Sequence, residues 1–317
     1  MGAVLANGVL HARDLNTANQ FHREFFCCLY NLHTHVDALT GIIPSRNADN
    51  PASLIRAMSY IQGQFTRYNR SVFLQPFNVE GKNYYNVIAS FGPPSQYRMI
   101  IGAHYDVYGD QPGADDNASG IAVLLELGRL LADETLDRTV DLVAFCLEEP
   151  PYFRTPSMGS AIHARSLIKA GIVVEIMVSI DMVGYFNQKP PTRGLLARWV
   201  THTLKNRINT TSVIDTERQH GLGLRIATLL AAGSSLDAVT LTPPEGTPGM
   251  DFSDHLNYWR LGIPAVLVTN FPVSGNPHYH CPTDTLERLD FSRMVEMVRG
   301  IFWMIVRSSD LRSATGK

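Results

Sequence analysis

The sequence has little cysteine, no excess of either charge and no long apolar run. Four cysteines in 317 residues are too few for a disulfide framework, so we read them as reduced thiols. A net charge of −2 provides no basic field for nucleic acid or anionic lipid. No stretch reaches the ~20 apolar residues that a membrane helix needs. These absences argue against a disulfide-rich module, a nucleic-acid-binding protein and a membrane-spanning protein.

The beginning of the chain also lacks a recognisable export signal. Residues 1–6 have neither the charged start nor the long apolar run of a secretory signal peptide, so we expect no intact signal in this chain. The compartment stays open. Secretion or a periplasmic location would require a signal that has been removed, and the cytoplasm is the alternative. The oligomeric state cannot be read from the sequence.

No internal repeat, low-complexity tract or linker divides the chain. Hydrophobic residues make up 45% and charged residues 18%, which is typical of a globular protein with a large core. We expect one domain over residues 1–317, with a helical segment at 1–66 packed on the same core. Residues 187–250 match no motif, although they are expected to supply the wall of a pocket.

Apolar strands and amphipathic helices alternate along the chain. The patterns predict helices at 15–42, 52–66, 117–133, 160–170 and 288–307, and strands at 84–91, 98–103, 140–147, 173–180 and 264–269. The run at 140–147 is apolar almost throughout, as expected for a strand covered on both faces. This alternation predicts an α/β fold with a mostly parallel mixed central sheet and helices on both faces.

Acidic and histidine side chains recur just after the apolar strands. They are His104 and Asp106 after 98–103, Glu148 and Glu149 after 140–147, Asp181 after 173–180, and His280 in the loop after 264–269, with Asp115 and Asp116 just before the helix at 117. Ligands bind outside the carboxyl ends of strands in open α/β sheets. Parallel strands would therefore bring these side chains to one edge of the sheet.

A cluster of this composition needs cations. Crowding at least four carboxylates without them would raise some pKa values strongly and cost several kcal/mol. Ligation by histidine and carboxylate suits zinc, with manganese or cobalt as substitutes. An aspartate shared between two ions would give the bridged pair, roughly 3.5–4 Å apart, of hydrolytic enzymes.

Each motif alone has an ordinary explanation. A single His-x-Asp is usually a surface hydrogen bond, a Glu-Glu pair is usually solvated, and the Asp115-Asp116-Asn117 run could simply cap a helix. Four separate strand ends that carry ligand-type residues are hard to obtain by chance. The combination therefore favours a metal centre.

In these segments the sequence resembles the co-catalytic di-zinc aminopeptidases of clan MH, the group that includes bacterial leucyl aminopeptidases. The matching segments are 102–106 (GAHYD), 113–120 (GADDNASG), Glu148-Glu149, Gly159-Ser160, 179–182 (SIDM), 253–255 (SDH), 262–264 (GIP), and Tyr279-His280 followed by Asp284-Thr285. The resemblance runs from about residue 50 to the end of the chain. It implies the zinc-aminopeptidase (phosphorylase/hydrolase-like) fold and a single metallopeptidase domain.

The resemblance also implies a set of metal ligands. His104 and Asp181 would bind one zinc, Glu149 and His280 would bind the other, and Asp116 would bridge the two. The family's bridging residue stands directly before the asparagine of this loop, which selects Asp116 over its neighbour.

Three further roles come from the same resemblance. Glu148 would be the general base that takes a proton from metal-activated water and hands it to the leaving amine. Asp106 would hydrogen-bond the distal nitrogen of His104 and fix its orientation. Tyr279 would donate a hydrogen bond from its hydroxyl to the developing oxyanion. A packed aromatic is the alternative reading of Tyr279.

The implied activity is that of an exopeptidase that removes N-terminal residues from peptides with a free N-terminus. The nearest alternative is a glutaminyl-peptide cyclotransferase, a relative that would hold a single zinc with Asp116, Glu149 and His280. Tyrosine rather than tryptophan before His280 favours the peptidase. Carboxypeptidase or dipeptidase activity and a non-enzymatic relative are further alternatives, although no ligand or base is missing.

The sequence departs from the family pattern after Glu149. The family often has Glu-Glu-x-Gly followed soon by Gly-Ser, whereas here Pro150 and Pro151 intervene and Gly159 comes several residues later. This lengthened loop would flank the site. We interpret His163, on the helix after it, as structural rather than as a ligand. Asp254 and His255 are expected to begin a helix, and their roles stay open.

Overall fold

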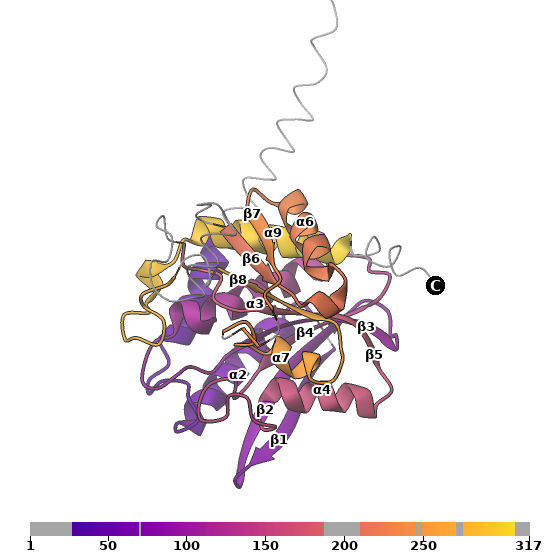
Figure 1. Cartoon of the computed structure of the whole chain (residues 1–317). Helices are drawn as coiled ribbons and strands as arrows, with labels where there is room; N and C mark the ends of the chain where they lie inside the picture. Colours follow the sequence, from indigo (N-terminus) through magenta and orange to yellow (C-terminus); the bar gives the residue numbers. More distant parts are fainter. Residues whose placement is uncertain are drawn as a thin grey trace, which may run out of the picture.

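The described chain folds around one eight-stranded mixed sheet (Figure 1). The computed structural model describes residues 27–69, 71–186, 210–244, 246–247, 249–270 and 275–307. The strands are β1 (Val72–Val79), β2 (Lys82–Phe91), β3 (Tyr97–His104), β4 (Thr139–Phe145), β5 (Val173–Ile180), β6 (Thr210–Ile214), β7 (Asp237–Leu241) and β8 (Ala265–Thr269). Their order across the sheet is β1-β2-β4-β3-β5-β8-β6-β7.

The centre of the sheet is parallel and its flanks are mixed. β4, β3, β5 and β8 run parallel to one another, whereas β1, β2 and β6 introduce antiparallel pairings. All seven residues of β4 are buried, as expected for a strand covered on both faces. The sequence prediction of a mostly parallel mixed sheet is confirmed.

Helices cover both faces of the sheet. The helices are α2 (Pro51–Thr66), α3 (Gly120–Leu131), α4 (Gly159–Lys169), α6 (Leu222–Gly233), α7 (His255–Trp259) and α9 (Phe291–Val306), and residues 27–40 are also helical. α2, α3, α6 and α9 contact one another on one face, and α4 packs with α7 on the other (Figure 1). The larger core cluster joins side chains from Leu32 to Ile305, so the described residues form one α/β domain.

The central elements lie close to where the periodicity placed them. The prediction for 117–133 is wrong at its start, because α3 begins at Gly120 and the preceding turn, Ala114–Ser119, contains non-helical residues. Asp116 has φ −106° and ψ 89°, and the Asn117 side chain accepts a hydrogen bond from the Gly120 amide at 3.0 Å. The Asn117 side chain therefore binds the Gly120 amide, which in a continuous helix would donate to a backbone carbonyl oxygen.

Two predictions about the ends of the chain extend beyond the described residues. The predicted helix at 15–42 is observed over 27–40, and its first part lies outside the described range. One domain over all of 1–317 therefore stays a prediction. Within the described residues, no helix combines the length and apolarity required to span a membrane.

Candidate metal centre and active site

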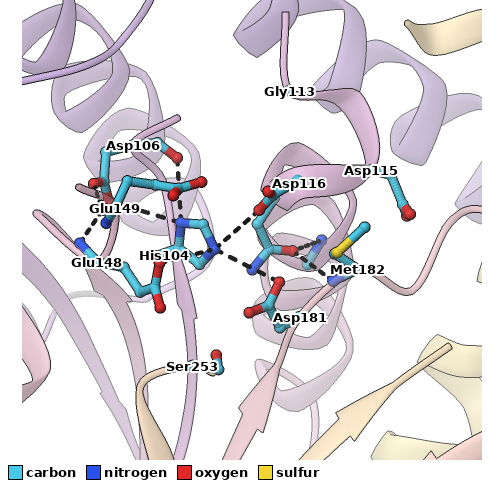
Figure 2. Close-up of polar contacts among 12 residues, drawn as sticks. His104, Asp106, Gly113, Asp115, Asp116, Glu148, Glu149, Asp181, Met182 and Ser253 are labelled. Carbon is cyan, nitrogen blue, oxygen red and sulfur yellow. Dashed lines mark hydrogen bonds and ion pairs between the residues drawn. The ribbon is translucent and has the colours of Figure 1, made fainter. Parts of the chain in front are cut away.

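The predicted site residues meet at the carboxyl ends of the parallel strands. Figure 2 shows six of them: His104, Asp106, Asp116, Glu148, Glu149 and Asp181. His104 is the last residue of β3, and Asp181 directly follows β5. The register pairs Gly102 with Ser179, so two residues further along His104 and Asp181 reach the same level. The segment after β3 brings Asp116 to this edge, and the loops after β4 and β8 bring Glu149 and His280.

Two groups of ligand atoms share one carboxylate. The first is His104, Asp116 and Asp181, with His104 Nε2 3.3 Å from Asp116 Oδ1 and 3.6 Å from Asp181 Oδ1. The second is Asp116, Glu149 and His280, with His280 Nε2 3.2 Å from Asp116 Oδ2 and 3.3 Å from Glu149 Oε2. The two oxygens of Asp116 thus face different histidines, which is the arrangement that a bridging ligand requires.

The chemistry of these side chains fits divalent cations. Glu149 Oε1, Asp181 Oδ1 and His280 Nε2 are buried and have no hydrogen-bond partner among the described residues. Burial and neighbouring Asp116 raise the pKa of Glu149 to about 8. Burial lowers the pKa of His280, but the neighbouring carboxylates of Asp116 and Glu149 outweigh it and raise the value to about 10. Without cations the site would take up protons to balance its carboxylates.

Glu148 belongs to neither of the two ligand groups that share Asp116. Its Oε2 lies 4.0 Å from His104 Nε2, and burial raises its pKa well above the usual range although His104 opposes this. A third possible ligand group, His104, Glu148 and Glu149, overlaps the other two and would require ligands already used there. Glu148 is therefore placed beside the centre, within reach of a group bound to it.

Asp106 lies against His104, but not through the atom that was predicted. The Asp106 backbone carbonyl oxygen is 3.2 Å from His104 Nδ1, whereas its carboxylate Oδ1 is 3.7 Å away. The carboxylate instead accepts hydrogen bonds from the amides of Glu148 and Glu149, at 3.1 and 3.0 Å. The prediction of a carboxylate–imidazole hydrogen bond is wrong in this detail, because two peptide N–H groups occupy the carboxylate. Asp106 thus joins β3 to the Glu148-Glu149 turn.

Tyr279 lies at the same cavity as the ligands. Its ring stacks on that of His280 with centroids 3.8 Å apart. Burial, together with the carboxylates of Asp116 and Glu149, raises the pKa of the phenol above its ordinary value. The hydroxyl therefore remains a hydrogen-bond donor at neutral pH.

Two aspartates that the sequence left without a role support the bridging loop. Asp284 accepts hydrogen bonds from the amides of Asp115 and Asp116, at 2.9 and 3.1 Å. Asp115 in turn accepts from the Gly184 amide at 2.8 Å and from Asn276 Nδ2 at 2.8 Å. Asp284 stands four residues after His280 in a matching segment, and this was the signal available. These bonds fix the backbone that presents Asp116.

Other histidine and aspartate residues near the site have distinct environments. His163 Nδ1 lies 2.6 Å from the Tyr258 hydroxyl, in the core between α4 and α7, so its interpretation as structural is confirmed. Asp254 precedes α7 as expected, and burial raises its pKa to about 7. The Tyr108 ring stacks on His280 with centroids 4.3 Å apart, a contact that no sequence signal indicated.

A cavity of about 410 Å³ opens onto the ligands. Its polar end is formed by the ligand carboxylates, Glu148 and Tyr279, and its other lining is mostly apolar: Pro150, Phe153, Met182, Ile214, Gly249, Phe252, Leu267 and Thr269. A volume of this size is typical of sites for small molecules. Ile214 and Gly249 lie within 187–250, so the prediction that this region contributes to the pocket wall is confirmed for these two residues, whereas Phe252 comes from the segment after it.

An α/β sheet with a histidine–carboxylate centre and an adjacent free carboxylate at its strand ends is the architecture of a metal-dependent hydrolase. The sequence model of peptidase family M28 matches residues 86–304. The chain belongs to this family and is therefore a peptidase, an enzyme class that hydrolyses peptide bonds.

Curated relatives agree with the family assignment. The chain is 36% identical over 285 residues to uncharacterized protein YfbL of Escherichia coli strain K12, covering 87% of each chain. It is 26% identical over 303 residues to a probable leucine aminopeptidase of Trichophyton verrucosum. That match covers 90% of this chain and 66% of the fungal protein, so the chain spans about two thirds of its length.

Solved structures share the fold at low sequence identity. LapB from Legionella pneumophila superposes with a TM-score of 0.69 at 22% identity, over 90% of this chain and 74% of that one. A glutaminyl cyclase from Bacteroides thetaiotaomicron gives 0.64 at 16% identity, over 88% and 97%. The predicted zinc-aminopeptidase fold is confirmed, and a glutaminyl cyclase shares it.

Proposed function

We propose that this peptidase is a zinc-dependent aminopeptidase that removes single residues from the N-terminus of peptides. The chemistry of the ligand groups, the family membership and the similarity to a probable leucine aminopeptidase support this proposal. The observation that carries it is the position of Asp116, whose two carboxylate oxygens lie 3.3 and 3.2 Å from the imidazoles of His104 and His280.

Two zinc ions would be held at this centre. His104 and Asp181 would bind one, Glu149 and His280 the other, and Asp116 both. Bound zinc would lower the pKa of water and polarise the scissile carbonyl. A histidine–carboxylate ligand set without cysteine is typical of zinc hydrolases.

The remaining side chains would move the proton and orient the substrate. Glu148 takes a proton from the attacking water and delivers it to the leaving amine, which its buried position and raised pKa favour. Tyr279 donates a hydrogen bond from its hydroxyl to the carbonyl oxygen as negative charge develops there. The surrounding carboxylates attract a free α-amino group, which explains removal of one residue at a time.

The proposal is tested with para-nitroanilides of leucine, alanine and glutamine, before and after exhaustive chelation. We expect hydrolysis that is lost on chelation and restored by added zinc. An N-acetylated leucine para-nitroanilide is the control, because a substrate without a free amine should be cleaved at least ~100-fold more slowly. Activity that persists after complete metal removal would overturn the mechanism.

A cyclase relative shares the fold, so the same preparation should be tested for that activity. A glutaminyl-peptide cyclotransferase would release ammonia from an N-terminal glutaminyl peptide without cleaving its peptide bond. It would hold one zinc at Asp116, Glu149 and His280. Because the group of His104, Asp116 and Asp181 is also present, we expect elemental analysis to show two zinc ions per chain. We also expect cleavage of the peptide bond without release of ammonia.

A further inference from the structure

Two loops that line the cavity meet through their aromatic side chains. The first, residues 150–158, follows the Glu148-Glu149 turn and precedes α4. The second, residues 249–253, precedes α7. Each contributes one phenylalanine to the cavity lining, Phe153 from the 150–158 loop and Phe252 from the 249–253 loop. Because α4 and α7 lie side by side, the loops that lead into these helices are adjacent (Figure 1).

The two phenylalanines contact each other and share one cation. Their ring centroids are 5.5 Å apart at an interplanar angle of 80°, an edge-to-face arrangement. The guanidinium carbon of Arg154 lies 5.5 Å from the Phe153 ring centroid and 5.2 Å from that of Phe252. Both distances are within the range of cation–π attraction.

Arg154 also forms an ion pair across the loops. Its Nη2 pairs with Oδ2 of Asp251, the residue directly before Phe252. The Arg154 carbonyl oxygen accepts a hydrogen bond from Arg260 Nη1 at 3.1 Å, and its amide donates to Met158 Sδ at 3.1 Å. Arg154 adopts φ 62°, in the left-handed region, so the loop bends at this residue. The backbone of Arg154 is thus fixed within the 150–158 loop, while its side chain binds the 249–253 loop.

The position of this ion pair indicates that it serves the pocket rather than the stability of the fold. The side chains of Arg154 and Asp251 are 43% and 31% exposed. Ion pairs this open to solvent contribute little to folding. Other contacts anchor the 150–158 loop, including the hydrogen bond from the Tyr152 hydroxyl to Glu80 at 3.1 Å. Loss of the ion pair should therefore leave the domain folded and release only the aromatic wall.

We infer that the Arg154–Asp251 ion pair positions Phe153 and Phe252 as an aromatic wall of the cavity, and that this wall sets which N-terminal side chains the enzyme prefers. The inference rests on the proposed function, because it assigns the cavity to the side chain of the residue that is removed. A leucine side chain reaches the wall and gains contact with the two rings, whereas an alanine side chain does not. Phe153 and Phe252 are then specificity-determining residues, and Arg154 and Asp251 are positioning residues.

The first test compares kcat/KM for leucine and alanine para-nitroanilide. Removing an aromatic contact from an apolar pocket changes such discrimination by about tenfold or more, so Phe252→Ala and Phe153→Ala should each lower the leucine-to-alanine ratio about tenfold. Phe252→Leu is the milder variant and should lower it less. Phe73→Ala, which removes an exposed phenylalanine from β1, is the matched control and should leave the ratio unchanged.

The second test asks whether the ion pair acts as one unit. Arg154→Ala and Asp251→Ala should each lower the leucine-to-alanine ratio, and the double variant should be no worse than either single variant, because contacting residues are not additive. The exchanged pair, Arg154→Asp with Asp251→Arg, should recover part of the ratio. Lys169→Ala removes an exposed cation at the end of α4 and is the control for charge.

A binding measurement separates this inference from the proposed function. L-leucine and L-alanine are titrated into the wild type and Phe252→Ala by calorimetry, with circular dichroism showing that each variant is folded. Weaker leucine binding with unchanged alanine binding supports the wall even if no substrate is cleaved, in which case the proposed function alone is wrong. Hydrolysis by the wild type with leucine-to-alanine ratios unchanged in every variant would overturn the wall and leave the proposed function standing.

Discussion

At the scale of single residues, the acidic side chains of the centre have different partners. Asp116 faces two imidazoles, and its backbone amide is held by Asp284. Asp106 is held by two peptide amides, so it fixes the turn that carries Glu148. Glu148 itself lies beside the ligand groups, and burial keeps its pKa raised. Under the proposed function, these environments suit Asp116 to bridging, Asp106 to positioning and Glu148 to proton transfer.

The assignment of Glu148 predicts a variant that binds metal but does not turn over. Glu148→Gln removes the proton acceptor and keeps a side chain of similar shape, so we expect two zinc ions to remain and kcat to fall by about 10²–10⁴. The control is Glu134→Gln, a change at an exposed glutamate away from the site. Near-normal turnover in Glu148→Gln, measured together with zinc content, would show that another group is the base.

The bridging position of Asp116 predicts a different loss. Asp116→Ala removes a ligand from both groups at once, so zinc content should fall for both ions together with activity. Elemental analysis after gel filtration measures this, and Asp133→Ala at an exposed position is the control. Retention of one tightly bound zinc would mean that Asp116 serves only one of the two ions and does not bridge them.

At the scale of elements, the sequence predicted the central strands and helices but not the flanks of the sheet. β3, β4, β5 and β8 are apolar runs that contain or precede ligand-type residues, and this combination can be recognised in a single sequence. β6 is buried but begins with the polar residues Thr210, Thr211 and Ser212, so no apolar run in the sequence indicates a buried strand there. β1 contains Pro76, which is tolerated because β1 is an edge strand.

The gathering of ligand-type side chains at the strand ends could be predicted from the sequence, whereas the aromatic contacts around them could not. Ligand types and strand ends are local signals, whereas the Phe153–Phe252 contact and the Tyr108–His280 stack join segments far apart in the chain. Nothing in the sequence around these aromatics distinguishes a cavity wall from a packed core. The start of α3 was missed because a side chain, that of Asn117, replaces helical hydrogen bonds there.

Two glycines, Gly159 at the junction between β4 and α4 and Gly63 inside α2, should respond in opposite ways to substitution by alanine. A Cβ on Gly159 would overlap the Asn86 side-chain oxygen and lie 2.5 Å from the Cys146 carbonyl oxygen, so Gly159→Ala should lower the free energy of unfolding by roughly 1–3 kcal/mol. A Cβ on Gly63, inside α2, would meet no atom within 4 Å, so Gly63→Ala should raise it by about 0.5–1 kcal/mol. Urea denaturation measures both, and equal effects of the two substitutions would contradict the packing at the junction.

At the scale of the whole molecule, the fold buries titratable groups on both faces of the sheet, and they make stability depend on pH. The metal centre is one such set. The other includes His35, His163 and His255, for each of which burial lowers the pKa to about 4. These histidines are neutral in the folded protein at neutral pH and titrate near 6.5 in the unfolded chain. The pH dependence therefore has a part that does not come from the ligands.

The sign of that part follows from proton binding. Above pH 6.5 neither state protonates these histidines, and they leave stability unchanged. Between about pH 6.5 and 4 the unfolded chain binds protons that the folded protein does not, so the free energy of unfolding falls as the pH falls. For one histidine the loss at pH 5 is about 2 kcal/mol.

His163→Gln isolates this contribution, because the ligand carboxylates titrate alike in both proteins and cancel in the comparison. Glutamine can keep a hydrogen bond to Tyr258, which His163 contacts at 2.6 Å, but cannot take up a proton. Urea denaturation in chelator at pH 7.5 and pH 5 should show a decrease in stability for the wild type that is about 2 kcal/mol larger than for His163→Gln. His33→Gln, at an exposed histidine of the 27–40 helix, is the control and should leave the decrease as in the wild type. If the decrease were the same in His163→Gln and the wild type, His163 would have to be protonated in the folded core, and the α4–α7 face would be less tightly packed than its contacts indicate.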